Sequence, residues 1–326
     1  MLETYRWLLY VTRFYGCHPH TIRERSVRFR PLMLYSLIAC GVYCLASYHA
    51  AGVVQCASTG AMIVGCALQQ INRYTRGSYM IATTLLSCLR HLEFERGVAA
   101  ARKFDDLTRH RKPAHRRAQW LALLGVHVAW TLFAAYMQYA VDDKILWRTT
   151  TIQCVTRAAF STQVAKFCFL FDALRRRFRL VNDMCQGSPG VVVGEHLTIL
   201  HLQRLHQCLT DATKYLSSHY SPQLFCWLTF MIIDILTYIF FSIYTASNPK
   251  IVILQCVLIL FISIQMIVIG GVCHLTCVQE AIELGVYLRV HPLRIRVFDL
   301  FNVNNHFTFL VFAVTLMYVI LASSIH

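Results

Sequence analysis

Long apolar runs divide this chain, and basic residues gather in the stretches between them. A helix needs about twenty mostly apolar residues to cross the hydrocarbon core of a bilayer. Seven segments of the chain meet that requirement. Because lipid offers no partner to unpaired backbone groups, each segment is predicted to be a membrane-spanning helix. The predicted spans are 31–49, 52–70, 118–139, 150–173, 222–244, 251–274 and 306–325.

The basic residues predict the direction of these spans. The N-terminal stretch and the connections after the second, fourth and sixth spans hold most of the Lys and Arg residues, including the run RRRFR at 175–179. The connections after the first, third and fifth spans are short and hold few. Connections rich in Lys and Arg stay in the cytoplasm. The sequence therefore predicts a cytoplasmic N-terminus and an extracellular C-terminus.

Two of the long inner connections show a helical pattern. In 195–221 the apolar residues recur at spacings of three and four, which is typical of an amphipathic helix, and this helix is expected to continue into the fifth span. The segment 78–108 carries a similar stripe and would extend the second span inward. Since amphipathic helices bury their apolar faces, we expect the two to pack together as an intracellular helical anchor.

Composition supports one polytopic membrane domain over residues 1–326. The chain is 56% hydrophobic and only 14% charged, whereas soluble domains keep about a quarter of their residues charged. Its net charge of +15 raises nucleic-acid binding as an alternative. The basic residues follow the predicted inner connections, however, so we expect no nucleic-acid partner.

The 14 cysteines do not indicate a disulfide framework. Most lie within apolar runs, the others lie in or beside basic segments, and none falls in a predicted outer connection, where an oxidising environment would favour disulfides. Cys273 and Cys277 are one helical turn apart, with His274 between them. Without a second pair of ligands nearby, this spacing predicts neither a metal site nor a cofactor.

Several ionisable residues fall inside the predicted spans, where charge is costly and is usually functional. Asp234 lies near the middle of the fifth span, and Arg157 and Lys166 lie in the fourth. Nine residues separate the two cations, so they project from roughly opposite faces of a helix. An ion pair between Asp234 and Lys166 is one expected use of the aspartate. A ligand-binding or gating role is the other.

An outward-facing pocket for a small organic molecule should be mostly apolar and aromatic, with a few polar groups. The outer halves of the third to sixth spans supply such residues, although aromatic residues also form belts at membrane interfaces. Paired glycines near the inner end of the sixth span, Gly270 and Gly271, suggest either a gating hinge or close helix packing. The pocket candidates are Trp130, Tyr136, Arg157, Tyr238 and Gln255.

Two stretches carry a resemblance to a known family. The first is FDLFNVNNHFTFLVFAVTLMYVILASSI, residues 298–325, and the second is LQRLHQCLTDATKYLSSHYSPQLF, residues 202–225. Together with the reversed seven-span plan, they resemble the insect gustatory receptors of the arthropod chemoreceptor superfamily. The resemblance implies a ligand-gated cation channel for small-molecule tastants, built as a homo- or hetero-tetramer in the plasma membrane of sensory neurons.

The same resemblance places the last span around a central pore, with Tyr318 and Ser324 facing or flanking it. The family pattern reads Thr-Tyr, five apolar residues, then Gln-Phe. This chain has Met317 before the tyrosine, and Ser324 and Ile325 at the end. A non-conducting accessory subunit of a mixed tetramer is therefore the alternative.

Other classes of membrane protein fit less well. G-protein-coupled receptors have the opposite direction of spans. A transporter or an enzyme would need a repeated half or a cluster of His, Asp and Glu at membrane depth, and the sequence has neither. The identity of the ligand is not encoded in any motif of the chain.

Overall fold

The computed structural model describes the core helices of the chain and part of its connections. Most of the described residues are helical, as the all-α prediction requires, and six helices have defined bounds among them. The described residues are 6–16, 21–22, 27–28, 30–52, 74–75, 78–108, 125, 128–130, 132–133, 136, 144–185, 199–244, 249–281, 296–297, 301–302, 310–311, 313–314 and 317.

The helices are α1 (Arg6–Phe14), α2 (Arg30–Gly52), α4 (His91–Thr108), α6 (Lys144–Cys185), α7 (Ile199–Tyr244) and α8 (Pro249–Ala281). Two very short antiparallel strand pairs, which the sequence did not predict, accompany them. They are β1 (Thr21–Ile22) with β2 (Val27–Arg28), and β3 (Arg296–Val297) with β4 (Phe301–Asn302).

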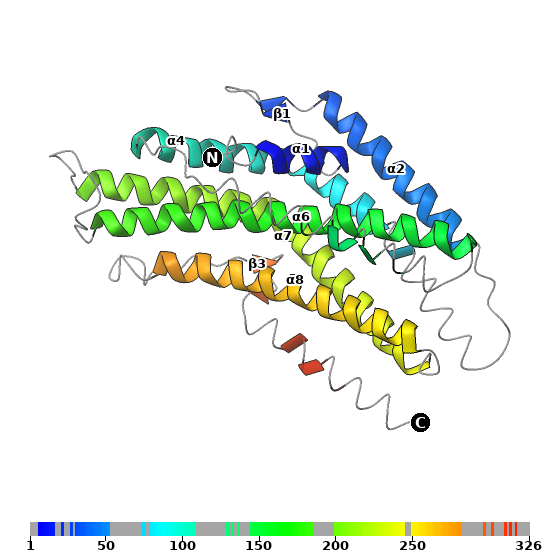
Figure 1. Cartoon of the computed structure of the whole chain (residues 1–326). Coiled ribbons are helices and arrows are strands. Elements are labelled where there is room, and N and C mark those ends of the chain that lie inside the picture. Colours follow the sequence, from blue (N-terminus) through cyan, green and yellow to red (C-terminus); the bar gives the residue numbers. More distant parts are fainter. Residues whose placement is uncertain are drawn as a thin grey trace.

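Three long helices, α6, α7 and α8, pack against one another and form the centre of the molecule (Figure 1). With 42 residues, α6 is about 63 Å long, roughly twice the thickness of a bilayer core. The last turns of α6, the first turns of α7 and the last turns of α8 gather at one end of the bundle, where α4 covers α7 (Figure 1). We call this end the platform; it is the end predicted to be cytoplasmic.

Four of the predicted spans fall within described helices: 31–49 in α2, 150–173 in α6, 222–244 in α7 and 251–274 in α8. Among the described residues, two helical stretches are long and apolar enough to cross a membrane, Leu200–Phe240 and Gln255–Cys277. The total of seven spans and their direction stay predictions. The other three spans, 52–70, 118–139 and 306–325, lie largely outside the described residues.

The two predicted amphipathic segments are helical in the structure, and their cytoplasmic position stays a prediction. The amphipathic segment before the fifth span and the span itself form one helix, α7. The helix Ser78–Leu89 is followed, after a turn at Arg90, by α4. The buried face of α4, which includes Phe94, Val98 and Phe104, packs against α7, so the two helices bury their apolar faces on each other as expected.

Gly97 allows α4 to approach α7 closely. A Cβ at this position would lie 2.7 Å from Cγ of Leu216 and 3.2 Å from the backbone oxygen of Ala212. Real Cβ atoms essentially never come as close as the first distance. A side chain at residue 97 would therefore push the two helices apart.

Pro222 lies inside α7, where a proline has no N–H to donate to the carbonyl four residues earlier. That carbonyl belongs to Ser218. Nη1 of Arg90, at the turn before α4, donates to it over 2.7 Å and also reaches the Ser218 hydroxyl at 3.2 Å. The donor that α7 lacks is thus supplied from the helix packed against it.

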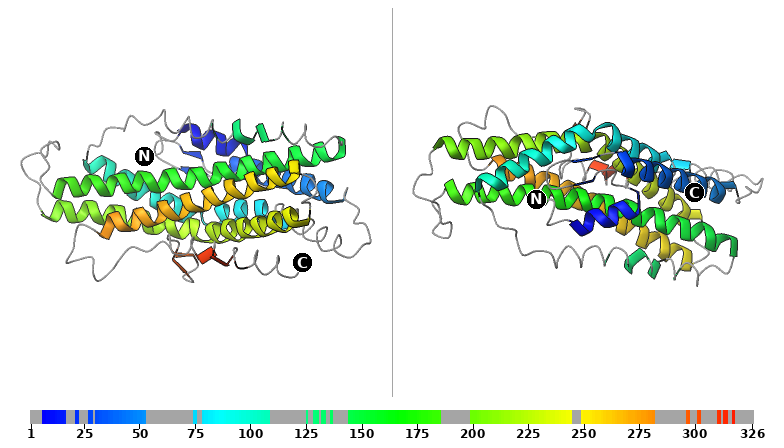
Figure 2. Two further views of the ribbon diagram at one scale, coloured as in Figure 1. Left: turned by 60° about the horizontal axis from the view of Figure 1, so that its bottom comes forward. Right: turned by 90° about the horizontal axis from the view of Figure 1, so that it is seen from above.

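The first helix, α1, lies against α6 and ends beside α2 (Figure 2). Leu8 packs on α6 in a small cluster that includes Ala173 and Phe169. Gly16 ends the helix with a φ of 72°, a conformation that L side chains rarely adopt, and a Cβ there would lie 2.5 Å from Cβ of Ala39. Glycine is therefore required at this corner for two reasons.

The proposed hinge in the sixth span lies within α8, which continues as a helix through Gly270 and Gly271. Among the described residues, a Cβ on Gly271 would meet no heavy atom within 4 Å. The hinge stays a prediction.

Candidate functional site

A buried ion pair joins α6 to α7. Nη2 of Arg157 lies 2.9 Å from Oδ2 of Asp234, and both side chains are almost fully buried. The same Nη2 donates a hydrogen bond to the hydroxyl of Tyr238, which lies one turn after Asp234 on the same face of α7. A buried cation requires such partners, because removal from water is otherwise too costly.

Aromatic rings enclose the same guanidinium group. Its central carbon lies 5.6 Å from the centre of the Trp130 ring and 5.1 Å from that of Tyr238. The electron-rich ring faces attract the cation at these distances. Arg157 therefore links α6, α7 and the residues of the third predicted span around Trp130.

A second polar bridge lies one turn further along α6. The hydroxyl of Ser161 accepts hydrogen bonds from Nε1 of Trp130, at 3.1 Å, and from Nε2 of Gln265 on α8, at 2.7 Å. Phe261 packs edge-to-face on Trp130, with 5.1 Å between ring centres. We call the two bridges together, with Trp130, Arg157, Ser161, Asp234, Tyr238 and Gln265, the polar cluster.

The expected pairing of Asp234 with Lys166 is wrong. Asp234 pairs with Arg157, and the Lys166 ammonium group lies 5.8 Å from the centre of the Tyr220 ring. Tyr220 precedes Asp234 by fourteen residues of α7, which corresponds to about 21 Å along a helix. Lys166 thus lies at a different depth in the bundle from the aspartate.

The structure brings together only some of the predicted pocket residues. Trp130, Arg157 and Tyr238 meet in the polar cluster. Gln255 on α8 is also buried. Its Oε1 accepts a hydrogen bond of 2.8 Å from the hydroxyl of Ser242, which lies one turn after Tyr238 on α7. Tyr136 is 37% exposed. The two residues predicted to line a pore, Tyr318 and Ser324, lie outside the described residues.

Two members of the polar cluster, Ser161 and Gln265, were not predicted from the sequence. Ser161 lies one turn after Arg157 in the same span, so it shares that residue's face of the helix. That spacing is a signal from which Ser161 could have been found. Gln265 lies on a different helix, and only the packing of α8 against α6 brings it to Ser161.

An elongated groove of about 530 Å³ begins at the Ser161–Gln265 bridge and runs between α6 and α8 towards the platform. Its middle is apolar, and it ends beside Asp172 and Arg175. The described residues that line it do not include Arg157 or Asp234. The groove is therefore adjacent to the ion pair and separate from it.

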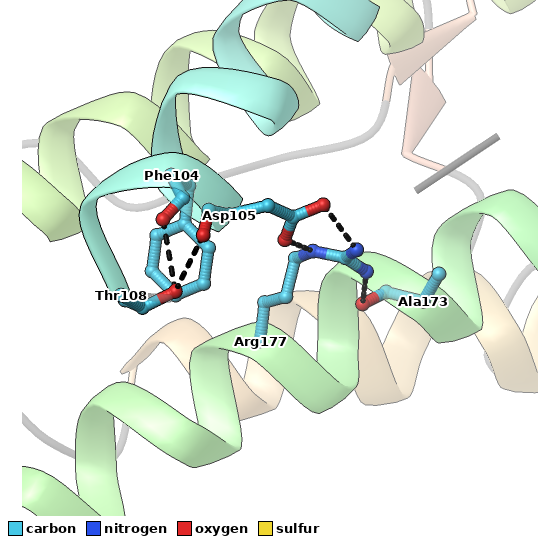
Figure 3. Close-up of polar contacts among 5 residues, drawn as sticks. All are labelled: Phe104, Asp105, Thr108, Ala173 and Arg177. Atoms are coloured by element: carbon cyan, nitrogen blue, oxygen red, sulfur yellow. Dashed lines mark hydrogen bonds and ion pairs between the residues drawn. The ribbon is translucent and has the colours of Figure 1, made fainter. Parts of the chain in front are cut away.

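An ion pair also holds the platform together. Nε and Nη2 of Arg177 on α6 each lie 2.8 Å from an oxygen of Asp105 on α4, and Nη1 donates to the backbone oxygen of Ala173 (Figure 3). Burial alone would raise the pKa of Asp105, but the hydrogen bonds and charge of Arg177 act in the other direction, and the net shift is downward. The carboxylate is therefore ionised and fixes α4 on α6.

A buried histidine lies where α7 meets the turn before α4. Nδ1 of His219 is 2.9 Å from the backbone oxygen of Arg90, so this nitrogen carries the proton and donates it. Nε2 accepts from the side-chain amide of Gln223 at 3.3 Å. Burial lowers the pKa of His219 to about 3, and the nearby charges of Lys166 and Arg90 act in the same direction. The imidazole is neutral at physiological pH.

Comparison with protein families decides the assignment. Residues 5–283 match the sequence profile of the family described as 7tm Chemosensory receptor. The chain belongs to this family. The resemblance to arthropod chemoreceptors is thereby confirmed for most of this chemosensory receptor. The stretch from residue 298 onward lies beyond the matched residues.

Solved structures with the same fold include an insect olfactory receptor. The receptor described here is similar to the insect olfactory receptor OR5 from Machilis hrabei, with 11% identity and a TM-score of 0.61 over 98% of this chain and 97% of that one. The complex of OR5 with eugenol gives 12% identity and a TM-score of 0.63 over 100% and 99% of the two chains. At this identity the similarity shows a shared fold. No curated protein matches the receptor.

Proposed function

We propose that this chemosensory receptor is a subunit of a ligand-gated cation channel that detects small molecules, such as tastants, at the plasma membrane of sensory neurons. Family membership and the fold shared with an olfactory receptor support the proposal. That relative also exists as a complex with eugenol, a small molecule. The subunits would assemble as a homo- or hetero-tetramer with related chains.

The polar cluster is the observation that carries the proposal for this chain. It concentrates a buried cation, a carboxylate, a phenol and an indole at the junction of α6 and α7. A ligand shifts a conformational equilibrium only if it contacts one state more favourably than the other. A small polar ligand that replaced the Tyr238 hydroxyl or the indole beside Arg157 would change how α6 and α7 are held together.

Ligand-evoked current tests the proposal. The receptor would be expressed in cells with a surface-accessible tag, alone and with related subunits, and challenged with panels of sugars, bitter compounds and volatiles during whole-cell recording. We expect an inward cation current for at least one class of compound. Conservative variants of the cluster, such as Tyr238→Phe, should shift the effective concentration at unchanged surface expression. Abundant surface protein without evoked current in any combination would contradict channel function.

A second candidate function is that of an accessory subunit that does not conduct alone. The C-terminal sequence favours it, because Met317, Ser324 and Ile325 replace the Thr, Gln and Phe of the gustatory-receptor pattern. Co-expression separates the two functions. An accessory subunit would give no current alone, yet would change the ion selectivity or ligand response of a conducting relative.

Detection of terminal tags tests the proposed direction of the spans. A tag on the N-terminus should be accessible to antibody only after permeabilisation, whereas a tag on the C-terminus should be accessible on intact cells. The opposite result would contradict a cytoplasmic platform.

A further inference from the structure

The groove between α6 and α8 is lined by one face of each helix. The lining positions recur at spacings of three and four on both helices, and the two sets keep the same spacing over fourteen residues. The described residues that line it are Ser161, Val164, Ala165, Cys168, Phe169, Asp172 and Arg175 on α6, and Phe261, Ile264, Gln265, Val268, Val272 and Leu275 on α8.

Among the described residues that line this groove, polar groups lie only at its two ends. At one end, the hydrogen bond of 2.7 Å between Ser161 and Gln265 ties α6 to α8. At the other end lie Asp172 and Arg175, beside the platform. The described lining residues between these ends are apolar apart from the thiol of Cys168. Such a lining suits a hydrocarbon chain and offers nothing to a sugar or a free ion.

The length of the groove suits one leaflet of a membrane. Fourteen residues of helix correspond to about 21 Å, close to the roughly 20–22 Å that one leaflet spans when its headgroup region is included. The volume of about 530 Å³ is therefore spread along an extended shape. Side chains on its α8 wall are open to the surroundings, with Ile264 49%, Val268 44% and Leu275 45% exposed.

The end of the groove beside the platform carries excess positive charge. Nη2 of Arg175 lies 2.8 Å from Oδ1 of Asp172, and Nη2 of Arg176 lies 2.6 Å from Oδ2 of the same carboxylate. Two guanidinium groups thus share one carboxylate, and the exposed Arg179 follows one turn later. Arginine binds phosphate through pairs of parallel hydrogen bonds, and the cytoplasmic leaflet is rich in anionic lipid.

We propose that the groove binds an anionic phospholipid of the cytoplasmic leaflet. One acyl chain lies between α6 and α8, with its end near the Ser161–Gln265 bridge, and the phosphate lies at Arg175 and Arg176. The proposal rests on the proposed cytoplasmic position of the platform. It does not depend on whether the receptor conducts ions. The bound acyl chain would fill the space that the side chains of α6 and α8 leave between the two helices.

Photolabelling of the full-length receptor tests this site. The protein would be reconstituted in phosphatidylcholine vesicles that contain a small fraction of phosphatidylserine with a photoactivatable group at the end of one chain. Parallel vesicles would contain phosphatidylcholine with the same labelled chain. Labelled peptides would be identified by mass spectrometry. We expect phosphatidylserine to label the positions near Ser161 and Gln265, and phosphatidylcholine to label them several-fold less.

Matched variants separate the chain from the headgroup. Val268→Trp fills the groove and should abolish this labelling, whereas Ile267→Trp, on the neighbouring and similarly exposed position outside the groove, should not. Arg175→Gln should lower the preference for phosphatidylserine by about fivefold, the value of one cation near an anionic surface. Asp172 keeps Arg176 as its partner in that variant. Arg204→Gln, on the exposed side of α7, is the control for charge.

Labelling spread evenly along α8, or equal labelling by the two lipids, would overturn the proposal. So would retention of full labelling in Val268→Trp. If Val268→Trp does not fold, the headgroup preference in Arg175→Gln still decides. A receptor that is labelled as expected but gives no current in any combination of subunits would contradict channel function and leave the lipid site standing.

Discussion

Arg157 illustrates how much of the candidate site depends on a single side chain. It is an ion-pair partner of Asp234, a hydrogen-bond donor to Tyr238 and a cation over the face of Trp130. Because it is buried, each of these partners offsets part of the free energy of removing the charge from water. A substitution of Arg157 would therefore change both the packing of the helices and the response to a ligand.

Loss of the carboxylate should destabilise the receptor strongly. Asp234→Asn leaves a buried cation without its counter-charge, for which we expect a loss of about 3–5 kcal/mol in the free energy of unfolding. Thermal unfolding in detergent, followed by fluorescence-detected size exclusion, measures it. Asp211→Asn on the exposed face of the same helix is the control. A double variant, Arg157→Met with Asp234→Met, should recover most of the loss, and equal unfolding temperatures for Asp234→Asn and Asp211→Asn would contradict the pairing.

His219 should make the platform sensitive to acid. Its pKa in the folded receptor, about 3, is lower than the ordinary value of 6.5, so the unfolded chain binds more protons between these two pH values. The stabilisation from the neutral imidazole is complete above about pH 6.5 and falls by about 1.4 kcal/mol per pH unit as the pH drops towards 3.

Unfolding temperatures measured between pH 7.5 and pH 5 check this expectation. His219→Asn keeps a donor for the Arg90 carbonyl but does not titrate, so its unfolding temperature should change less with pH. His201→Asn, at a half-buried position of the same helix, is the control and should behave like the unmodified receptor. An identical pH dependence in all three proteins would contradict a role for His219.

At the scale of helices, the platform depends on one helix completing the hydrogen bonds of another. The Ser218 carbonyl, left without its intrahelical donor by Pro222, receives its hydrogen bond from Arg90. This contact crosses between segments that are distant in the sequence, so it ties the start of α4 to the middle of α7.

Substitution of Arg90 should therefore destabilise the receptor, and replacement of Pro222 should reduce that loss of stability. Arg90→Met leaves the Ser218 carbonyl unpaired, and we expect a loss of about 1–3 kcal/mol. Pro222→Ala restores an N–H within α7, so Arg90→Met should cost less in that background. Unfolding free energies of the four proteins form a double-mutant cycle. Strict additivity would show that the two residues act independently.

The close approach of α4 to α7 makes a second prediction at this scale. Gly97→Leu should weaken the platform by about 1–3 kcal/mol or more, because overpacking forces the helices apart and Ala212 offers only rigid backbone. Gly41→Leu, on a helix face with nothing within 4 Å, should be neutral or stabilising. Limited proteolysis of the connection that follows α4 would compare the two. Equal protection of both variants would contradict close packing at Gly97.

For the molecule as a whole, the apolar pattern was sufficient to predict helices at the four described spans, but neither the continuation of α6 to Cys185 nor the mutual register of the helices. The period of three and four residues ran without a break from the amphipathic segment into the fifth span, so α7 was predictable as one helix. The partner of Asp234 was not predictable. Arg157 and Lys166 lie on the same helix nine residues apart, and only the offset between α6 and α7 decides which of them meets the aspartate.

The continuity of α6 has a mechanical consequence. One unbroken helix contains Arg157 in the polar cluster, Arg175 at the mouth of the groove and Arg177 at the contact with α4. In a rigid helix, a tilt of about 5° about Arg157 displaces Arg177, which lies twenty residues or about 30 Å further along, by about 3 Å. A tilt too small to break the Arg157–Asp234 contact would therefore separate Arg177 from Asp105, unless α4 moves with it.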